Sequence, residues 1–166
     1  QSIPFDLLSQ GWHTHIGYDT RNFTLNANAN FGHYTDGNRV EREYGEAMRW
    51  FGTSRISVGG GYAFRHLHFT QQFNHGYFDP EQYRSHLGVG GIRFGLGKVY
   101  RVEALGYFGV EKINQGSYTR AGEFQLNNHF LIHHWQLEGG YSHYQLVQST
   151  AAFRADMVSG SVGYRF

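Results

Sequence analysis

The segment NFTLNANANF, residues 22–31, decides which regular structure this chain forms. Odd positions from Phe23 to Phe31 are apolar, and even positions from Thr24 to Asn30 are polar. A helix would wind the asparagines around its whole circumference, because it has about 3.6 residues per turn. In a strand successive side chains point to opposite faces, so the two sets separate completely. The segment therefore predicts a β-strand with one apolar face and one polar face.

The same alternation recurs along the chain in segments of about ten residues. It is clearest in residues 56–65, 100–111 and 135–142, and we count about nine such strands in all. About ten residues is the length at which a tilted strand crosses a bilayer. The arginine and glutamate residues of these segments fall on the polar face, away from any hydrocarbon. The repeated pattern is typical of strands that cross a membrane.

The composition agrees with this interpretation. Aromatic residues make up 17% of the chain, 23 residues are glycine, and the mean hydropathy is -0.53. No apolar run reaches the roughly 18 residues that a membrane helix needs. Strands that show apolar side chains to lipid and polar ones to a lumen average out as mildly polar. We therefore predict an all-β fold, an antiparallel transmembrane β-barrel that occupies residues 1–166 as one domain.

Turn signals suggest how much of a barrel the chain contains. Short polar or glycine-containing breaks occur at residues 19–22, 36–38, 52–54 and 95–98, whereas residues 70–82 form the one substantial loop. Bacterial barrels have an even number of strands, short periplasmic turns and longer external loops. An odd count of about nine predicts that the chain is the C-terminal portion of a larger barrel. A closed barrel of eight strands, miscounted by one, remains the alternative.

The C-terminal residues 152–166 form the predicted terminal strand. Even positions from Val158 to Phe166 are apolar or glycine, and the chain stops on phenylalanine. This ending, with Tyr164 and Phe166, resembles the terminal signature of bacterial outer-membrane barrels that their assembly machinery reads. The resemblance implies the bacterial outer membrane as the location, and its lipid and the barrel-assembly machinery as partners. A soluble sheet is the weaker reading, because a repeated uncovered aromatic face drives association.

Polar side chains of the predicted strands are expected to project into the barrel. In a wide barrel they line a water-filled passage, and in a narrow barrel of about eight strands they pair and fill the interior. The residues predicted to line the lumen are Arg49, Arg65, Arg84, His86, Arg101, Glu103, Glu138 and Arg165.

Two short motifs resemble a known family. The loop GYFDPEQY, residues 76–83, looks like a segment in the C-terminal barrels of exopolysaccharide-secretion porins, and HYTDGNR, residues 33–39, is similar to another hairpin there. Porins of this kind export cellulose or poly-N-acetylglucosamine through about sixteen strands, preceded by helical tetratricopeptide repeats. The resemblance implies a pore for an exopolysaccharide such as cellulose. It also implies polysaccharide in transit and an upstream periplasmic repeat domain or synthase complex as partners.

The chemistry of that loop is compatible with sugar. Tyr77, Phe78 and Tyr83 offer flat faces on which pyranose rings stack, and Asp79 accepts hydroxyl protons. The alternative is an ordinary loop core, in which Pro80 and a neighbouring glycine fix turns while the aromatic rings pack in the barrel mouth. The two readings are compatible with each other.

Charge and cysteine content exclude several classes of partner. The formal net charge of +1 gives no field for nucleic acid, and the absence of cysteine excludes disulfides and thiolate metal sites. His13 and His15, like His66 and His68, share one face of a strand, but no third metal ligand follows from the spacing. We expect no metal, no cofactor and no nucleic-acid partner.

Two functions stay open from the sequence. The first is passive export through a polar lumen that guides a glycan, and the second is a small closed eight-stranded barrel that serves as a structural anchor or adhesion protein. An enzyme is not expected. Ser85–His86 and Ser142–His143 are sequence neighbours, so each serine and histidine point to opposite faces of a strand and cannot form a catalytic pair.

Overall fold

The computed structural model describes residues 9–71, 80–97, 99–147 and 152–164. These residues form nine strands, and none of them belongs to a helix that is long and apolar enough to cross a membrane. The strands are β1 (Ser9–Asp19), β2 (Phe23–Tyr34), β3 (Arg39–Gly52), β4 (Ile56–Phe69), β5 (Gln82–Leu96), β6 (Tyr100–Ile113), β7 (Thr119–Ile132), β8 (Trp135–Val147) and β9 (Ala152–Tyr164). The predicted all-β barrel-type fold with about nine strands is confirmed.

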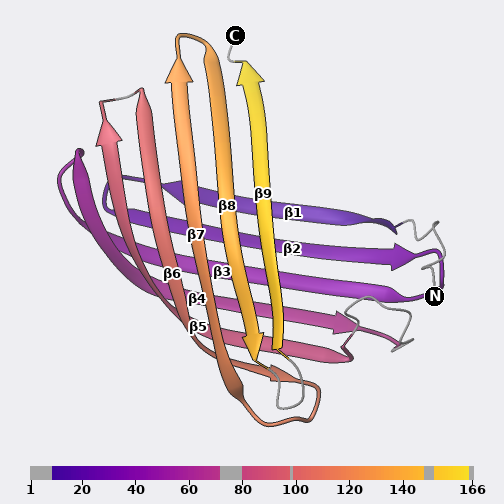
Figure 1. Ribbon diagram of the computed structural model, residues 1–166. Helices are drawn as coiled ribbons and strands as arrows, with labels where there is room; N and C mark the ends of the chain where they lie inside the picture. Colours follow the sequence, from indigo (N-terminus) through magenta and orange to yellow (C-terminus); the bar gives the residue numbers. More distant parts are fainter. Residues whose placement is uncertain (1–8, 72–79, 98, 148–151, 165–166) are drawn as a thin grey trace.

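All nine strands belong to one antiparallel sheet in which each strand pairs with its neighbours in sequence. The sheet twists so strongly that β7 to β9 run across the direction of β1 to β3 (Figure 1). Such a twist accumulates from the right-handed twist of each strand. Among the described strands, β1 and β9 each pair with one neighbour only. The sheet is therefore a half-barrel with two unpaired edges.

The turns lie where the sequence predicts them. Gly37, with φ of 86°, lies in the β2–β3 turn, and Gly97, with φ of 60°, lies in the β5–β6 turn. Glycine favours both positions because it has no Cβ atom to oppose positive φ. The longest connection joins β4, which ends at Phe69, to β5, which begins at Gln82. It carries the loop predicted at residues 70–82.

Asn38 ties the β2–β3 hairpin to the start of this loop. Its side chain is fully buried. The amide nitrogen donates to the Gln71 carbonyl oxygen at 2.8 Å, and the amide oxygen accepts from the backbone nitrogen atoms of Arg39 at 3.0 Å and Gln71 at 3.1 Å. One side chain thus satisfies backbone groups from two neighbouring connections at this end of the sheet.

We expect Asn38→Ala to lower the free energy of unfolding by about 1–3 kcal/mol, because it removes three hydrogen bonds from a fully buried side chain to partly buried backbone groups. Urea titration of the detergent-folded protein measures this loss as a lower midpoint. Gln115→Ala, in the exposed β6–β7 turn, is the control and should leave the midpoint unchanged. Equal midpoints for the two variants would show that the Asn38 hydrogen bonds do not stabilise the folded protein.

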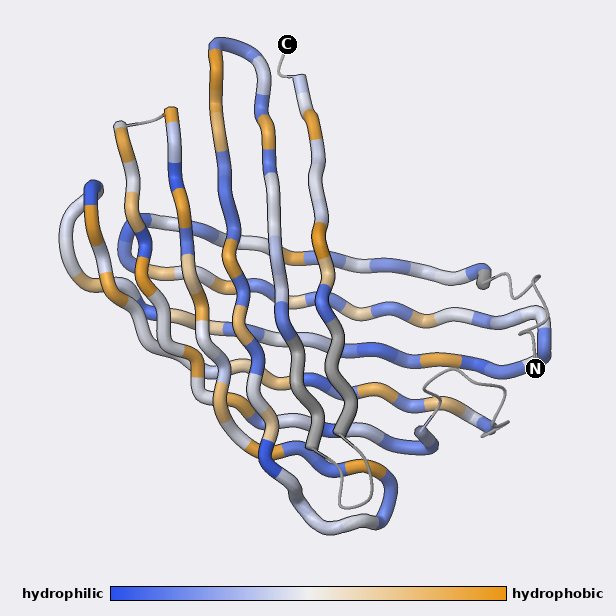
Figure 2. Tube along the Cα trace, in the orientation of Figure 1, coloured by the Kyte–Doolittle hydropathy of each residue, from blue (hydrophilic) through white to orange (hydrophobic). Residues whose placement is uncertain are grey.

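Residue polarity alternates along the strands, so the sheet has two different faces (Figure 2). Contacts between strands that are not neighbours identify the inner side of the curve. The Tyr107 hydroxyl in β6 donates to Glu46 Oε2 in β3 at 2.8 Å. In a flat sheet, strands three positions apart lie about 14 Å from each other. We call the face that carries Glu46 and Tyr107 the concave face, and the opposite one the convex face.

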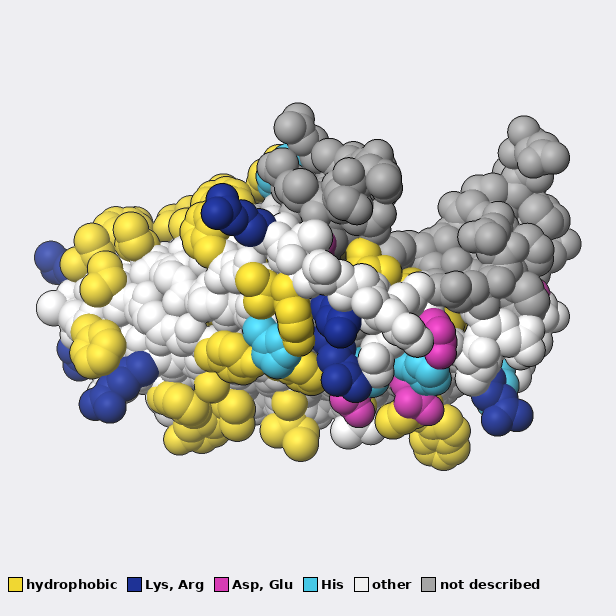
Figure 3. Space-filling view, turned by 90° about the horizontal axis from the view of Figure 1, so that it is seen from below, with side chains coloured by type: hydrophobic (Ala, Val, Ile, Leu, Met, Phe, Trp, Pro, Cys, Tyr) yellow, Lys and Arg dark blue, Asp and Glu magenta, His cyan; other side chains and the backbone are white. Residues whose placement is uncertain are grey.

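The convex face carries exposed apolar side chains on every strand. Trp12 in β1 is 83% exposed and Phe108 in β6 is 73% exposed, and the other strands add further exposed aromatic and aliphatic side chains. Hydrophobic side chains project along much of the outline of the molecule, acidic and most histidine side chains gather toward one side, and basic side chains lie both among them and along the outline (Figure 3). Soluble monomers rarely expose so much contiguous apolar surface. The convex face therefore needs an apolar partner.

Candidate functional site

Side chains fill the centre of the concave face. Trp50, Met48, Leu87, Leu105 and Tyr107, from β3, β5 and β6, are each at most 4% exposed. Glycines on the neighbouring strands leave room for the indole ring, since a Cβ atom added at position 59 would lie 2.6 Å from Trp50 Cε3. The middle of the half-barrel is thus a packed apolar cluster between β3 and β7, which we call the central plug.

Arg93 connects the central plug to the first strand. Its guanidinium carbon lies 4.0 Å from the centre of the Trp50 ring, and its Nε donates to Glu103 Oε2 at 2.5 Å. Nη2 of Arg93 and Nη1 of Arg101 donate to the two carboxylate oxygens of Asp19, at 3.2 and 2.8 Å. These bonds tie the edge strand β1 to β5 and β6 across the concave face.

A second group of charges lies on the other side of the plug. Arg65 in β4 pairs with Glu123 in β7 at 2.6 Å, and their side chains are only 20% and 7% exposed. The hydroxyl groups of Tyr44 and Tyr107 both donate to Glu46 Oε2 at 2.8 Å. Each carboxylate therefore has donors, which offsets the cost of removing it from water.

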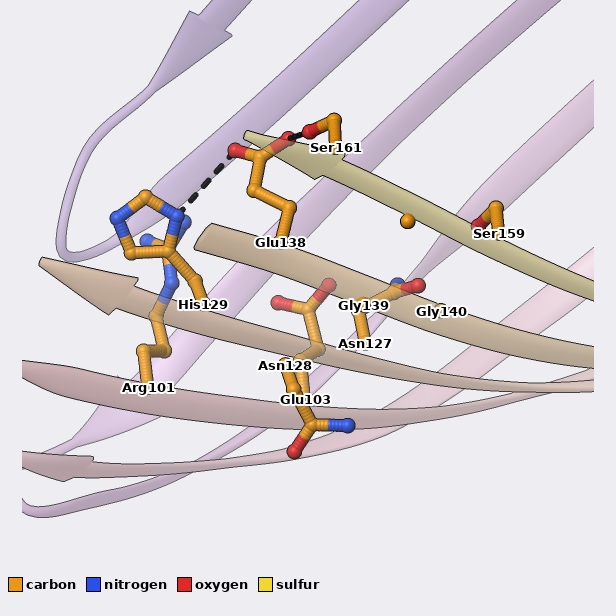
Figure 4. A pocket seen from close by; sticks show the side chains of 11 residues that line it. Arg101, Glu103, Asn127, Asn128, His129, Glu138, Gly139, Gly140, Ser159 and Ser161 are labelled. Atoms are coloured by element: carbon orange, nitrogen blue, oxygen red, sulfur yellow. Dashed lines mark hydrogen bonds and ion pairs between the residues drawn. The ribbon is translucent and has the colours of Figure 1, made fainter. Parts of the chain in front are cut away.

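Beyond the plug, β6 to β9 form an open polar pocket of about 460 Å³ (Figure 4). Glu138 lies at its rim and accepts from Gln136 at 2.7 Å, from Ser161 at 3.1 Å and from His129 Nδ1 at 3.3 Å. The side chains that line its concave surface are Arg101, Glu103, Asn127, His129, Glu138, Ser159 and Ser161.

A second polar surface lies on the concave face of β1 and β2. Asn26, Asn28 and Asn30 continue the row of polar side chains from which the strand was predicted, and they pair in register with β1 and β3. The imidazole rings of His13 and His15 stack at 6.5 Å, and His13 Nδ1 lies 2.5 Å from Asn30 Oδ1. Both flanks of the plug therefore present hydrogen-bond donors and acceptors, which suit hydrated, hydroxyl-rich ligands.

The residues predicted to line a lumen divide between the two faces. Arg65, Arg101, Glu103 and Glu138 lie on the concave face with the groups described above. Their role in a passage stays a prediction. Arg165 lies outside the described residues.

The predicted inward orientation of Arg49, Arg84 and His86 is wrong. Arg49 lies between Met48 and Trp50, which both point inward, so its guanidinium lies over the convex Phe51 ring at 5.4 Å. The His86 ring contacts the hydroxyl of the exposed Tyr62 at 2.5 Å. Arg84 has the same parity as His86 in β5 and therefore shares its face. The strand register decides the face, and side-chain polarity does not.

The predicted glycan loop is only partly described. Tyr77, Phe78 and Asp79 lie outside the described residues. Tyr83 is described, and the predicted stacking role for its ring is wrong. Its side chain is 6% exposed on the concave face, and its hydroxyl donates to the buried Glu111 at 3.2 Å.

Tyr164, half of the predicted assembly signal, lies on the convex face of β9. Its ring packs edge-on against Trp135, with the two centres 5.0 Å apart. Phe166 lies outside the described residues. Recognition of this ending by assembly machinery stays a prediction.

Sequence reasoning missed several concave residues, above all Asp19, Arg93 and Asn127. Arg93 alternates with Ile92 and Phe94, both exposed on the convex face, so the period of two carries a signal for its inward direction. Asp19 has no such signal. It closes β1 at a turn, and its role arises only because curvature brings it to Arg93, 74 residues away in sequence.

Among the described residues, no group of three or more histidine, aspartate or glutamate side chains is placed to hold a metal ion. His66 pairs with Glu43 at 3.5 Å on the convex face. His13 and His15 lie on the concave face beside amide groups.

No protein-family model matches this sequence, and no curated protein matches it either. Its fold matches a solved structure. That structure is described as a "Bacterial polysaccharide outer membrane secretin", and it superposes with a TM-score of 0.75 at 9% sequence identity. The match covers 95% of this chain and 57% of the other. The two proteins thus share a fold, and this chain spans little more than half the length of that secretin.

Proposed function

We propose that this chain is part of the wall of a bacterial outer-membrane pore through which a polysaccharide leaves the cell. The observation that carries the proposal is the two-faced half-barrel, which has the fold of a polysaccharide outer membrane secretin. The apolar convex face suits hydrocarbon, and the polar flanks of the concave face suit water and glycan hydroxyl groups. Transport is passive, and no chemical step is assigned to the chain.

The two unpaired edges support a larger closed barrel. An unpaired edge in a bilayer leaves backbone groups without partners, which costs several kcal/mol per group. Additional strands that join β1 to β9 remove both edges. A barrel of about sixteen strands also agrees with the 57% of the secretin that the chain spans. We propose that these strands belong to the same polypeptide.

Within that proposal, the glycan passes along the polar flanks of the central plug. Carboxylates and amides there, such as Glu103, Glu138 and Asn127, accept and donate hydrogen bonds along the sheet. We further propose an exopolysaccharide of the cellulose or poly-N-acetylglucosamine type, delivered by a periplasmic repeat domain or synthase complex. These finer assignments rest on the two sequence motifs.

Conductance in planar lipid bilayers tests the proposal. The full-length protein should give stable openings that soluble oligosaccharides of the carried polymer block, and unrelated oligosaccharides should block them less. The double variant Glu103→Gln/Glu138→Gln should lower the preference for cations over anions, because it removes two carboxylates from the polar pocket. Arg49→Gln, on the convex face, is the control. A protein that inserts but never conducts contradicts the pore.

The central plug favours a second candidate, a barrel with a packed interior that serves as an anchor or adhesion protein. Side chains of the plug are as buried as those of a soluble core, although the sheet is open. A small closed barrel fills its interior in this way. Silent insertion in the same bilayer experiment, together with resistance to unfolding, supports this candidate.

A further inference from the structure

Three basic side chains lie close together at one end of the convex face. On β5, β6 and β7 the convex face carries Arg84, Lys112 and Arg120, all within two residues of the strand ends nearest the β4–β5 and β6–β7 connections. Arg84 lies directly opposite Lys112 in the register. Arg120 pairs with Val110, so it lies diagonally from Lys112. Cross-strand and diagonal neighbours are within reach of long side chains.

No acidic side chain of β5, β6 or β7 faces this group, and Glu43, the carboxylate in the same row on β3, pairs with His66 instead. The glutamates of β6 and β7, which are Glu103, Glu111 and Glu123, all have the inward parity of Tyr107 and face the concave side. Among the described residues, no carboxylate lies within 4.0 Å of the charged nitrogen atoms of the three basic residues. Like charges opposite each other destabilise a sheet. An external anion between them would remove that cost.

An apolar hollow lies directly beside the basic group. It measures about 310 Å³, and its lining includes Arg120, Phe108, Gly122, Phe124 and His143, which pairs with Asp156 at 2.9 Å. Phe108 is 73% exposed and Phe124 is 43% exposed, and glycine between them leaves the hollow open. Arg120 thus stands at the rim nearest the strand ends, with Lys112 and Arg84 beyond it, and the aromatic side chains line the hollow farther from those ends. An amphiphile with an anionic head and an acyl chain has this same order of groups.

We propose that the convex face of β5 to β7 is a binding site for a membrane phospholipid whose phosphate headgroup carries a net negative charge. Arg84, Lys112 and Arg120 hold the phosphate by charge-assisted hydrogen bonds, and the acyl chain lies in the hollow between Phe108 and Phe124. The inference rests on the proposed function, because it requires the convex face to lie in lipid. The basic group alone would also bind a dissolved phosphate ion. The adjoining apolar hollow favours a lipid, because only a lipid has an acyl chain that can fill it.

Competitive lipid binding tests this site. The full-length protein in neutral detergent micelles is titrated with phosphatidylglycerol and, separately, with phosphatidylcholine. We expect the variant Arg84→Gln/Lys112→Gln to bind phosphatidylglycerol about thirtyfold more weakly, since each basic residue near an anionic surface contributes about a fivefold factor and two are removed. The matched control is Arg49→Gln/Arg55→Gln, which removes two exposed arginines at the other end of the sheet and should change binding less than threefold.

A second variant separates the lipid from a plain anion. A Cβ atom at Gly122 meets its nearest neighbour at 3.8 Å, so Gly122→Leu folds while its side chain fills the hollow. This variant should weaken phosphatidylglycerol binding and leave pyrophosphate binding unchanged.

Three outcomes overturn the site: equal affinity for the two lipids, full displacement of the lipid by pyrophosphate, or no effect of Gly122→Leu. Failure to insert into bilayers contradicts the proposed function instead. A protein that inserts but shows no preference for phosphatidylglycerol contradicts only the lipid site.

Discussion

Replacing Trp50 by alanine is expected to lower the free energy of unfolding by about 3–5 kcal/mol, the cost of deleting a large buried aromatic side chain. The indole is 2% exposed, and its Nε1 donates to Thr24 Oγ1 at 2.9 Å. It also forms the surface on which the Arg93 guanidinium rests at 4.0 Å. The substitution therefore removes packing, a buried hydrogen bond and the support of the arginine that reaches β1.

Urea unfolding of the protein in detergent micelles, followed by tryptophan fluorescence and by heat-dependent gel mobility, measures this loss. The control is Trp12→Ala, which removes the same side chain from an 83% exposed position on the convex face. It should cost less than about 1 kcal/mol, because the exposed ring has few protein contacts to lose. Similar losses for the two variants would mean that the central plug does not stabilise the half-barrel.

Much of the fold could be predicted because a period of two is visible in single strands. The segment from Asn22 to Phe31 gives the alternation of β2, and the turns follow from glycine and asparagine between such segments. The predicted inward direction also holds where polar residues occupy the concave face, as with Arg101 and Glu138. The local sequence pattern was sufficient wherever the polar side chains of a strand lie on its concave face and the apolar side chains on its convex face.

The faces of β3 and β5 could not be predicted in this way, because curvature buries part of the concave side. In the first half of β5, the inward positions hold Tyr83, the small Ser85 and Leu87, and the outward positions hold the larger polar side chains of Arg84 and His86. Farther along the same strand, Arg93 is inward. The polarity of the two faces therefore reverses within one strand. In β3 the adjacent residues Trp50 and Phe51 are both aromatic, so the sequence does not show which of them points inward.

The pairing of charges across the interior was also beyond local pattern. Arg65 and Glu123 lie on strands that are three positions apart, and nothing in the sequence around either residue indicates the other. Their distance of 2.6 Å is a consequence of how tightly the sheet curls. Strand twist and the volume of the plug set this curvature, and both depend on side chains from many strands at once.

A charge placed on each face of one strand tests the assignment of the two faces most directly. We expect Ala27→Arg to lower the stability of the protein in lipid vesicles by about 2–4 kcal/mol, since its side chain enters hydrocarbon near the middle of β2. Asn28→Arg, one residue away on the concave face, should cost less than about 1 kcal/mol. Ala27 pairs with Gly45, around which the convex surface is open, so the arginine fits without a clash.

Urea titration of each variant after refolding into vesicles gives the two free energies. The same pair of variants, measured in a detergent whose micelles are thin and well hydrated, should differ less, because an arginine side chain then reaches water more easily. A larger cost for Asn28→Arg than for Ala27→Arg would reverse the two faces. It would also remove the reason for placing polysaccharide inside the curve and lipid outside it.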